Sequence, residues 1–521
     1  MGVQELRARH WQRQILRAAV IATLLPGCRT LLEPMPRDDR SILPVSGVLQ
    51  EVPAPPRLEL PSTLPGGTAT LTPIPTDSQN TREDRLRAID TSFPPLPALG
   101  PDPVPRATSK DEGLALEALI EQAKANNPRI QQAMAEIDRN RGLWTQAGLY
   151  PNPTIGAQLD QIGDFGPYGQ FGGYINQNIV TGRKLSLAQG VAYYDLLNAR
   201  LALRRQEFEL AKQVRADYYG VLVAAESIRI GRLVYGLTEA IYRQQVSKLR
   251  AGQAANYDAS AARSTAAQSR TALFQANNRY MAAWKQLAAT LNAPDLPPAP
   301  LAGRVDAALP QYSFETLQER MLATHTDLAT ANNELAQAQQ ALVLEQRRVI
   351  PDVQNYVYMQ KDTLAASEPA PSFQVGFQIG VAVPIFNRNQ GAIAAAQATL
   401  ASRTREVERV RNDLVRNLAD AFERYETGRE QLALYRDVIL PDLVRAFRGN
   451  YEHYQVEPDV RNFNDVLTVQ QNYTTQLANY LLALQMQWQA IADLTAAVQV
   501  EDPYKLAEGL EPTLPEGWPL K

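Results

Sequence analysis

The chain repeats one pattern of predicted elements at a distance of 206 residues. Ile179-Val180 ends an alternating, strand-like stretch and precedes a long helical pattern, and Ile385-Phe386 does the same in the second half. Tyr257-Asp258 and Phe463-Asn464 lie just inside the helical patterns that come next. The pattern therefore predicts, for each half, a helix, two strands, a long helix, a turn and a return helix. Four lone strands beside helices of this length cannot form a stable open sheet, so the repeat requires partner chains.

The composition excludes several classes of protein. The net charge of −3 gives no basic field for nucleic acid, and the sequence has no apolar run of the roughly 18 residues that a transmembrane helix needs. Cys28 is the only cysteine, so no disulfide can form within one chain. The three histidines lack metal-ligand spacing, and no nucleophile–base motif or phosphate-binding loop is present. We therefore expect no enzyme, no catalytic residue, no metal site and no cofactor.

Residues 1–27 are typical of a bacterial lipoprotein-type signal peptide. Four arginines between Arg7 and Arg17 form a basic start, and residues 18–25 form a short apolar core. Leu25-Pro26-Gly27-Cys28 resembles the motif in which the cysteine is acylated and becomes the mature N-terminus, although Pro26 departs from it. The alternative is an ordinary cleaved signal with an incidental cysteine. In both cases the segment is excluded from the fold, and Cys28 is the candidate lipidation site.

Residues 28–112 predict an extended, proline-rich N-terminal arm. Residues 29–110 hold 16 of the 36 prolines, and serine, threonine and glycine fill much of the rest. Such a stretch cannot bury enough apolar surface to order itself. We expect a semi-rigid tether that spans about 3.1 Å per residue where it is polyproline-like. The sequence leaves open whether this arm reaches away from the folded body or lies along it.

Two stretches predict pairs of β-strands, one near 154–180 and one near 353–386. In the second, one face is apolar and the other is small or polar, because Gln and Gly occupy the alternate positions. In a soluble protein a helix layer would cover the apolar face, whereas in an outer membrane this face would meet lipid. The candidate lipid-facing residues are Phe373, Val375, Phe377, Ile379 and Val381. Candidate aromatics of the membrane interface are Tyr168, Tyr174, Tyr356 and Tyr358, although tyrosine is also an ordinary strand residue.

The rest of the chain predicts long antiparallel coiled-coil helices. Residues 182–250 predict a single helix on the order of 100 Å long, with apolar residues at spacings of three, four or seven. Narrow apolar seams on long helices build thin walls and no globular core. The expected segments are a first repeat at 113–293 with a return helix at 254–292, a linker at 294–310, a second repeat at 311–500 with a long helix at 389–456 interrupted at Pro441 and a return helix at 462–499, and a tail at 501–521.

This layout resembles the bacterial outer-membrane efflux proteins of the TolC family over about 113–500. The residues that carry the resemblance are Leu149 to Pro153 before the first strand, Thr181 to Lys184 after the second, and Val383 to Asn387 leading into Gly391 after the fourth. The resemblance implies a mainly α protein with a transmembrane β-barrel. Three chains would close a twelve-stranded barrel in the outer membrane, and their helices would form a periplasmic α-barrel. The implied partners are two sister chains, outer-membrane lipid, a periplasmic adaptor and an inner-membrane pump of the RND or ABC type, with no nucleic acid.

The resemblance also implies a periplasmic gate at the two helix turns, near 251–258 and 455–465. Asp465 falls where the family has an inward-facing aspartate, but the family's next aspartate is replaced by Thr468. Asp258, Glu457 and Asp459 are further candidates for the gate. The alternative for these acids is a role at helix N-termini, where Asp and Glu are stabilising. We expect both turns to contact the adaptor.

The leading function is passive conduction of small molecules or metal cations from the pump to the exterior. A type I protein secretion duct uses the same fold and remains an alternative. A lipid-anchored coiled-coil spacer without a pore is a third, but a spacer has no use for the alternating residues 373–381.

Overall fold

The computed structural model describes residues 82–105, 113–160, 169–362, 372–456 and 463–504. The chain divides into two units, residues 1–70 and 71–521, and every described residue belongs to the second. The expected signal peptide, Cys28 and Tyr168 lie outside the described residues, as do Glu457 and Asp459.

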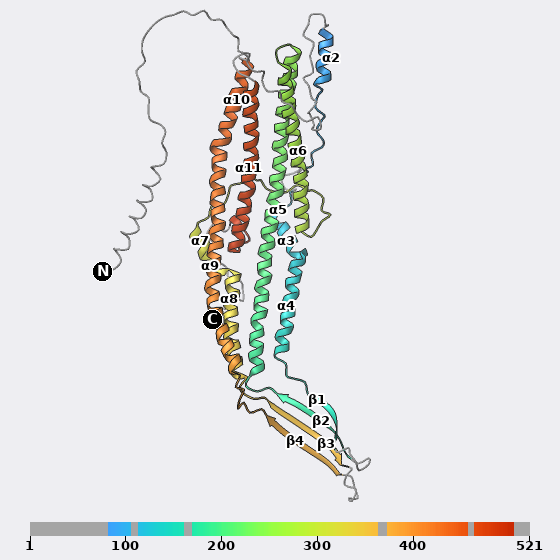
Figure 1. The fold of residues 1–521 in the computed structure, drawn as a ribbon, viewed down its shortest axis with the longest axis vertical. Coiled ribbons are helices and arrows are strands. Elements are labelled where there is room, and N and C mark those ends of the chain that lie inside the picture. The colour runs from blue at the N-terminus through green and yellow to red at the C-terminus, as the bar shows by residue number, and fades with distance from the viewer. Residues whose placement is uncertain (1–81, 106–112, 161–168, 363–371, 457–462, 505–521) are drawn as a thin grey trace, which may run out of the picture. The chain divides into compact units, whose positions relative to one another are not determined.

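The order of elements from α3 onward is the same in the two halves of the described chain (Figure 1). Each half has two helices, an antiparallel pair of strands, a long helix and a return helix. The first half contains α2 (Arg82–Ser92), α3 (Leu116–Asn126), α4 (Pro128–Ala147), β1 (Thr154–Asp160), β2 (Gln170–Ile179), α5 (Lys184–Arg250) and α6 (Asn256–Thr290). The second half contains α7 (Phe314–Thr324), α8 (Thr326–Arg347), β3 (Val353–Asp362), β4 (Ser372–Val381), α9 (Gln390–Leu434), the π-helical η1 (Tyr435–Ile439), α10 (Leu440–Val456) and α11 (Phe463–Val498).

The long helix α5 is bounded by residues with positive φ. Gly182 and Arg183 adopt φ of 67° and 59° immediately before it. After its end, the N–H of Gln253 donates to the carbonyl of Lys248 at 2.8 Å, around Gly252 with φ of 79°. Glycine suits this left-handed position because it has no Cβ to clash. The 67 residues between these turns contain no proline, so nothing interrupts the hydrogen-bond ladder over about 100 Å.

The long helix of the second half is interrupted close to Pro441, where the sequence predicts a break. Pro441 has no N–H, and the residues before it form the π-turn η1. The N–H of Leu440 donates to the carbonyl of Tyr435, five residues back instead of four. The interruption therefore begins at Tyr435, before Pro441, and the helix then resumes as α10.

Residues 82–105, hereafter the strap, differ from the extended tether that the sequence predicts. They begin with helix α2, and they pack on the hairpin of α5 and α6. Ile89 is fully buried and Phe93 is 7% exposed, and the hydroxyl of Tyr242 donates to the carbonyl of Pro94 at 2.9 Å. The expectation that this stretch cannot order itself does not hold for 82–105, which lies along the helices, one of the two placements that the sequence left open. The sequence could not choose between them, because the surface that buries these apolar residues comes from helices more than 100 residues further along the chain.

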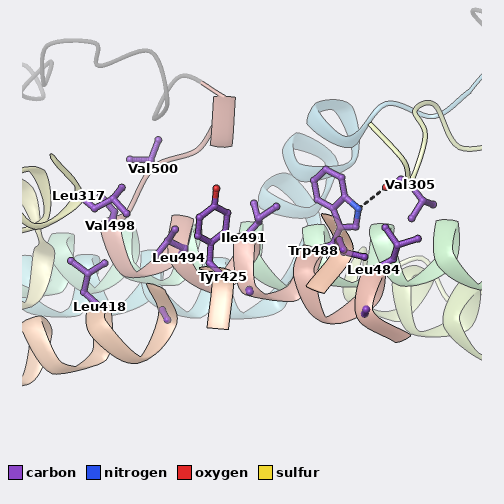
Figure 2. Close-up of a cluster of buried hydrophobic side chains, with 14 of the residues drawn as sticks. Val305, Leu317, Leu418, Tyr425, Leu484, Trp488, Ile491, Leu494, Val498 and Val500 are labelled. Atoms are coloured by element: carbon purple, nitrogen blue, oxygen red, sulfur yellow. Dashed lines mark hydrogen bonds between the residues drawn. The ribbon is translucent and has the colours of Figure 1, made fainter. Parts of the chain in front are cut away.

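The described helices have three clusters of buried side chains, two of which share Tyr219 and Leu222 at their margins, while the third lies further along α5. One joins α9 and α11 to α7 and the linker (Figure 2). There Trp488 is 1% exposed, its ring stacks on that of Tyr219 with centroids 3.8 Å apart, and its indole N–H donates to the carbonyl of Val305 at 3.0 Å. In the first half, Trp284 likewise donates to the carbonyl of Leu296 at 2.9 Å. Each return helix is thus fastened to the linker by a buried tryptophan.

Among the described helices, none combines the length and the apolar character needed to cross a bilayer.

Candidate functional site

The four strands form one antiparallel sheet in the order β1-β2-β3-β4. Strands from the two halves meet at its centre, where Tyr174 of β2 lies opposite Tyr358 of β3. Among the described residues, β1 and β4 each pair on one side only. All four strands connect to helices at the same end, so the sheet continues from one end of the helices (Figure 1). A sheet of this kind has two open edges that can pair with other chains.

One face of the sheet is apolar and exposed. Phe373, Val375 and Phe377 are 69%, 73% and 62% exposed, and Ile379 and Val381 are also exposed. The other three strands add Ile155, Leu159, Phe171, Ile175, Val357 and Met359 to the same set of exposed apolar residues. No described helix covers this face, because the sheet has no contacts with a helix comparable to those between its own strands. The soluble alternative, which needs a covering layer, therefore lacks that layer within the described chain.

The opposite face carries tyrosines packed over glycines. Tyr174 lies beside Gly156 of β1, and Tyr358 lies beside Gly376 of β4. A Cβ at Gly156 would stand 2.6 Å from ring atoms of Tyr174, so only glycine leaves room for the ring. Tyr356 stacks on Tyr174 with ring centroids 5.1 Å apart. These three tyrosines were candidates for the lipid interface, but they lie on the polar face, away from Phe373 and Phe377.

Amide side chains continue this polar face across the strands. The hydroxyl of Tyr356 donates to Gln158 Oε1, and Gln360 Nε2 donates to Gln170 Oε1 at 2.8 Å and to Gln374 Oε1 at 3.2 Å. The hydrogen bonds link all four strands from side chain to side chain. The sheet thus has one face suited to hydrocarbon and one suited to water.

The second candidate region is the end of the helices farthest from the sheet along α5. Asp465 lies exposed in the first turn of α11, and the hydroxyl of Thr468 donates to the carbonyl of Asn464 at 2.8 Å. Thr468 therefore makes an ordinary bond within its own helix. The exposure of Asp465 leaves its carboxylate open to solvent.

Asp258 is the third residue of α6 and takes part in the start of that helix. Burial raises the pKa of its carboxyl, and a hydrogen bond from the backbone N–H of Ala255 opposes this shift. A carboxylate that accepts from the residue preceding a helix satisfies a free backbone donor, as in a capping box. This contact supports the helix-terminus interpretation of Asp258. Of the four gate candidates, the structure describes Asp258 and Asp465, which lie in the first turns of the two return helices.

Contacts between the two hairpins near these turns were missed by sequence reasoning. Gln245 Nε2 donates to the hydroxyl of Tyr454 at 3.0 Å, and the hydroxyl of Tyr451 donates to Gln244 Oε1 at 2.5 Å. Lys248 Nζ lies 4.0 Å from the ring centroid of Tyr454, within the range of a cation–π interaction. Residues about 207 positions apart make these contacts, so no local pattern predicts them.

Within the described ranges, no three His, Cys, Asp or Glu side chains gather in a way that could hold a metal ion.

The comparisons with known proteins agree with this architecture. No family model matches the chain. The cobalt-zinc-cadmium resistance protein CzcC of Cupriavidus metallidurans is 25% identical over 379 residues, which cover 72% of this chain and 88% of that protein. The crystal structure of CusC superposes with a TM-score of 0.62 at 16% identity and covers 78% of this chain and 98% of its own. The open state of the MtrE outer membrane channel of Neisseria gonorrhoeae has a TM-score of 0.60 at 15% identity, covering 77% and 94%.

Proposed function

We propose that the chain is a member of the TolC family of outer-membrane channel proteins and that three copies of it form the channel of a tripartite efflux system. The protein lies in the outer membrane and extends into the periplasm. The sheets of three chains join edge to edge into a closed barrel, and the helices continue it as a tube. The channel is a passive conduit and carries out no catalysis.

The single observation that carries this proposal is the exposed apolar face of a sheet with two open edges. An open edge inside a bilayer leaves backbone N–H and C=O groups without partners, which costs several kcal/mol for each group. Closure with other chains removes both edges and leaves the apolar face toward lipid. Strands of 10 residues, such as β3 and β4, have the length that an outer-membrane barrel uses. The tyrosine and glutamine face then lines the lumen.

The cargo is proposed to be small molecules or metal cations. CzcC is named for resistance to cobalt, zinc and cadmium, and its match extends over most of both chains. Comparing the growth of a deletion strain with that of its parent on salts of these metals, and on toxic organic compounds, assigns the cargo class. Unchanged growth on both would leave protein secretion as the remaining duct function.

The partners are proposed to be a periplasmic adaptor and an inner-membrane pump, with the adaptor at the turns that end α5 and α10. The turn at residues 251–255 is exposed or half-buried and consists of small residues and one glutamine. Such residues permit close approach of another helical hairpin. Cys28 is proposed to be acylated. Mass spectrometry of the mature N-terminal peptide tests this directly, since Cys28→Ser abolishes the acyl mass.

The membrane placement is tested with one substitution on each face of β4. Phe377→Arg puts a charge on the lipid face and should destabilise insertion by about 2–4 kcal/mol. Gln378→Arg, its neighbour on the lumen face, should insert normally and change ion selectivity. Equal insertion of the two variants in a bilayer-folding assay would contradict the assignment of the faces.

The pore is tested by recording detergent-extracted protein in a planar bilayer. Discrete conductance steps from a particle with the mass of three chains are expected. A water-soluble monomer that needs no detergent and conducts nothing would overturn the proposal.

Asp465 is proposed to contribute one carboxylate per chain to a ring at the periplasmic end, with Glu457 and Asp459 as further acids of the same turn. A ring of carboxylates attracts cations and repels anions. Asp465→Asn should lower the ratio of cation to anion permeability, while Asp420→Asn, an exposed acid in α9, should not. Equal ratios in all three proteins would remove Asp465 from the gate.

A further inference from the structure

We propose that the junction between sheet and helices binds the phosphate headgroups of anionic phospholipids. The junction comprises residues 181–184, 345–352 and 383–390, which connect β2 to α5, α8 to β3 and β4 to α9. This inference rests on the proposed function, because it requires the apolar face of the sheet to lie in a bilayer. It adds a specific lipid class to that function.

Side-chain contacts bring the three segments of the junction together. The hydroxyl of Thr181 donates to the carbonyl of Pro351 at 2.6 Å, and Lys184 Nζ lies 2.7 Å from Asp352 Oδ1. On the other side, Asn389 Nδ2 donates to both the carbonyl and the carboxylate of Glu345, at 2.8 and 2.7 Å. The end of α8 is therefore held between the turns that start α5 and α9.

The junction carries more positive than negative charge. Lys184 pairs with Asp352 and Arg348 pairs with Glu345 at 2.8 Å, which accounts for both carboxylates of the three segments. The remaining cations are Arg183, Arg347 and Arg388. All three are exposed, and among the described residues none has a carboxylate within ion-pair distance. The segments thus present three guanidinium groups that the described part of the chain does not neutralise.

The junction also exposes large apolar side chains next to these arginines. Phe386 is 89% exposed, Val383 69% and Ile385 62%, and Tyr150, just before β1, is 66% exposed. The strands end only a few residues away, at Ile179 and Val381, so these side chains lie where the apolar face of the sheet stops. Aromatic and basic residues together at the edge of a membrane-spanning surface mark the headgroup level.

The combination selects a lipid over a free anion. A guanidinium group makes paired hydrogen bonds to phosphate oxygens. The attraction of an arginine to an anionic membrane surface contributes about 1 kcal/mol to binding. Free phosphate would satisfy the arginines but would leave Phe386 and Ile385 in water. A phospholipid satisfies both, with its phosphate on the arginines and its acyl chains against the apolar residues. Without a net negative charge, a zwitterionic phospholipid would gain less from the three arginines.

The test measures lipid preference in reconstituted bilayers of the full chain. Spin-labelled phosphatidylglycerol and phosphatidylcholine are compared by electron spin resonance for association with the protein, and conductance is recorded from the same preparation. The native protein should prefer phosphatidylglycerol. The combined variant Arg183→Gln, Arg347→Gln and Arg388→Gln should have a weaker preference for phosphatidylglycerol. The expected loss is about fivefold for each arginine removed, the factor that corresponds to about 1 kcal/mol. Salt should weaken the preference of the native protein.

The matched control removes three exposed arginines elsewhere. Arg279→Gln, Arg411→Gln and Arg448→Gln combined change the net charge equally and lie on α6, α9 and α10. The inference is overturned if the control loses the preference as much as the junction variant, or if inorganic phosphate displaces the labelled lipid. A native protein that conducts without any lipid preference overturns the inference and leaves the channel intact. A native protein that neither inserts nor conducts overturns both.

Discussion

The two long helices of this chain begin from the same turn and then differ in continuity. Arg183 precedes α5 with φ of 59°, and Asn389 precedes α9 with φ of 58°. From there α5 continues for 67 residues, whereas the second helix passes through the π-turn η1 before Pro441. The π-turn interrupts the regular hydrogen-bond ladder of the α-helix, because the N–H of Leu440 donates five residues back instead of four. The repeated architecture therefore tolerates a break in one of its copies.

A second difference is the support along each hairpin. The strap lies on α5 and α6, where Arg263 donates to the carbonyl of Ser92 at 2.9 Å and Arg250 pairs with Asp90 at 2.5 Å. The linker between the halves instead packs at the level of the two tryptophans, through Leu296 and Val305. The uninterrupted helix thus has extra support near its far end, and the interrupted helix receives no described segment of this kind there. Stability is unevenly distributed between the two hairpins.

The third difference is the N-cap residue of the helix that precedes the strands in each half, α4 in the first and α8 in the second. Asn127 Oδ1 accepts from the N–H of Arg129 at 2.9 Å, and His325 Nδ1 accepts from the N–H of Asp327 at 3.0 Å. The two caps have the same geometry, but only histidine loses its acceptor when it is protonated. The cap of α4 is therefore a side chain that does not titrate, whereas the cap of α8 is one that does.

The largest expected effect comes from removing the buried tryptophan of the interrupted hairpin. Trp488→Ala should lower the free energy of unfolding by about 3–5 kcal/mol, because it empties a packed site and leaves the carbonyl of Val305 without its donor. Thermal unfolding followed by circular dichroism measures the change. Gln471→Ala, exposed on the same helix, should stay within about 0.5 kcal/mol of the native protein. Similar losses in both would mean that Trp488 is not a major support.

Removing the anchor of the strap should affect one hairpin only. Phe93→Ala should destabilise the packing of the strap by about 3 kcal/mol. Amide hydrogen exchange should then accelerate in residues 82–99 and in the facing part of α5, with the part of α11 around Trp488 protected as before. Pro95→Ala, at an exposed position, is the control. Uniform acceleration over the whole chain would show that the strap is part of a single cooperative unit.

Acid should weaken the second half through His325. Burial lowers the pKa of its imidazole, with Asp327 opposing the shift and Arg205 adding to it. The unfolded chain therefore binds a proton at a higher pH than the folded one, so stability falls as the pH drops below about 6.5, by at most about 1.4 kcal/mol per unit. His325→Asn should keep the cap and remove this dependence. A slope unchanged by His325→Asn would assign it to other groups.

The smallest expected effect is a gain in stability. Gln487 is fully buried, and neither polar atom of its amide has a hydrogen-bond partner among the described residues. The residue before the other tryptophan is Ala283, so the first hairpin has no such amide there. Gln487→Leu should raise the free energy of unfolding by about 1 kcal/mol, since an unpaired buried amide is costly. A loss of stability of similar size would indicate that water or a partner chain satisfies the amide.

Much of the fold could be predicted because its signals are local. Alternation in residues 373–381 predicts a strand with an apolar face, and the exposure of Phe373 and Val375 agrees with it. The absence of proline around α5 predicts its length, and Gly252 predicts its end. These features depend on a few neighbouring residues, and they are present in any environment.

The features that the sequence did not reveal depend on distant surfaces. Ile89 and Phe93 precede a proline-rich stretch, and only packing on α5 and α6 makes them core residues. The bonds of Gln245 and Lys248 with Tyr454 cross between halves. The face on which the tyrosines lie could have been predicted from the sequence. Tyr174 is next to Ile175, and neighbouring residues of a strand point to opposite faces, so Tyr174 belongs on the polar face. The gate acids stay predictions, since only the positions of Asp258 and Asp465 are described.

The unpaired sides of β1 and β4 have a consequence for biogenesis. A solitary protomer would have to bring unsatisfied peptide groups into hydrocarbon, so it has no stable resting place there. Insertion and association should then be a single concerted event, and the yield of mature channel should rise more steeply than linearly with the supply of newly exported subunits.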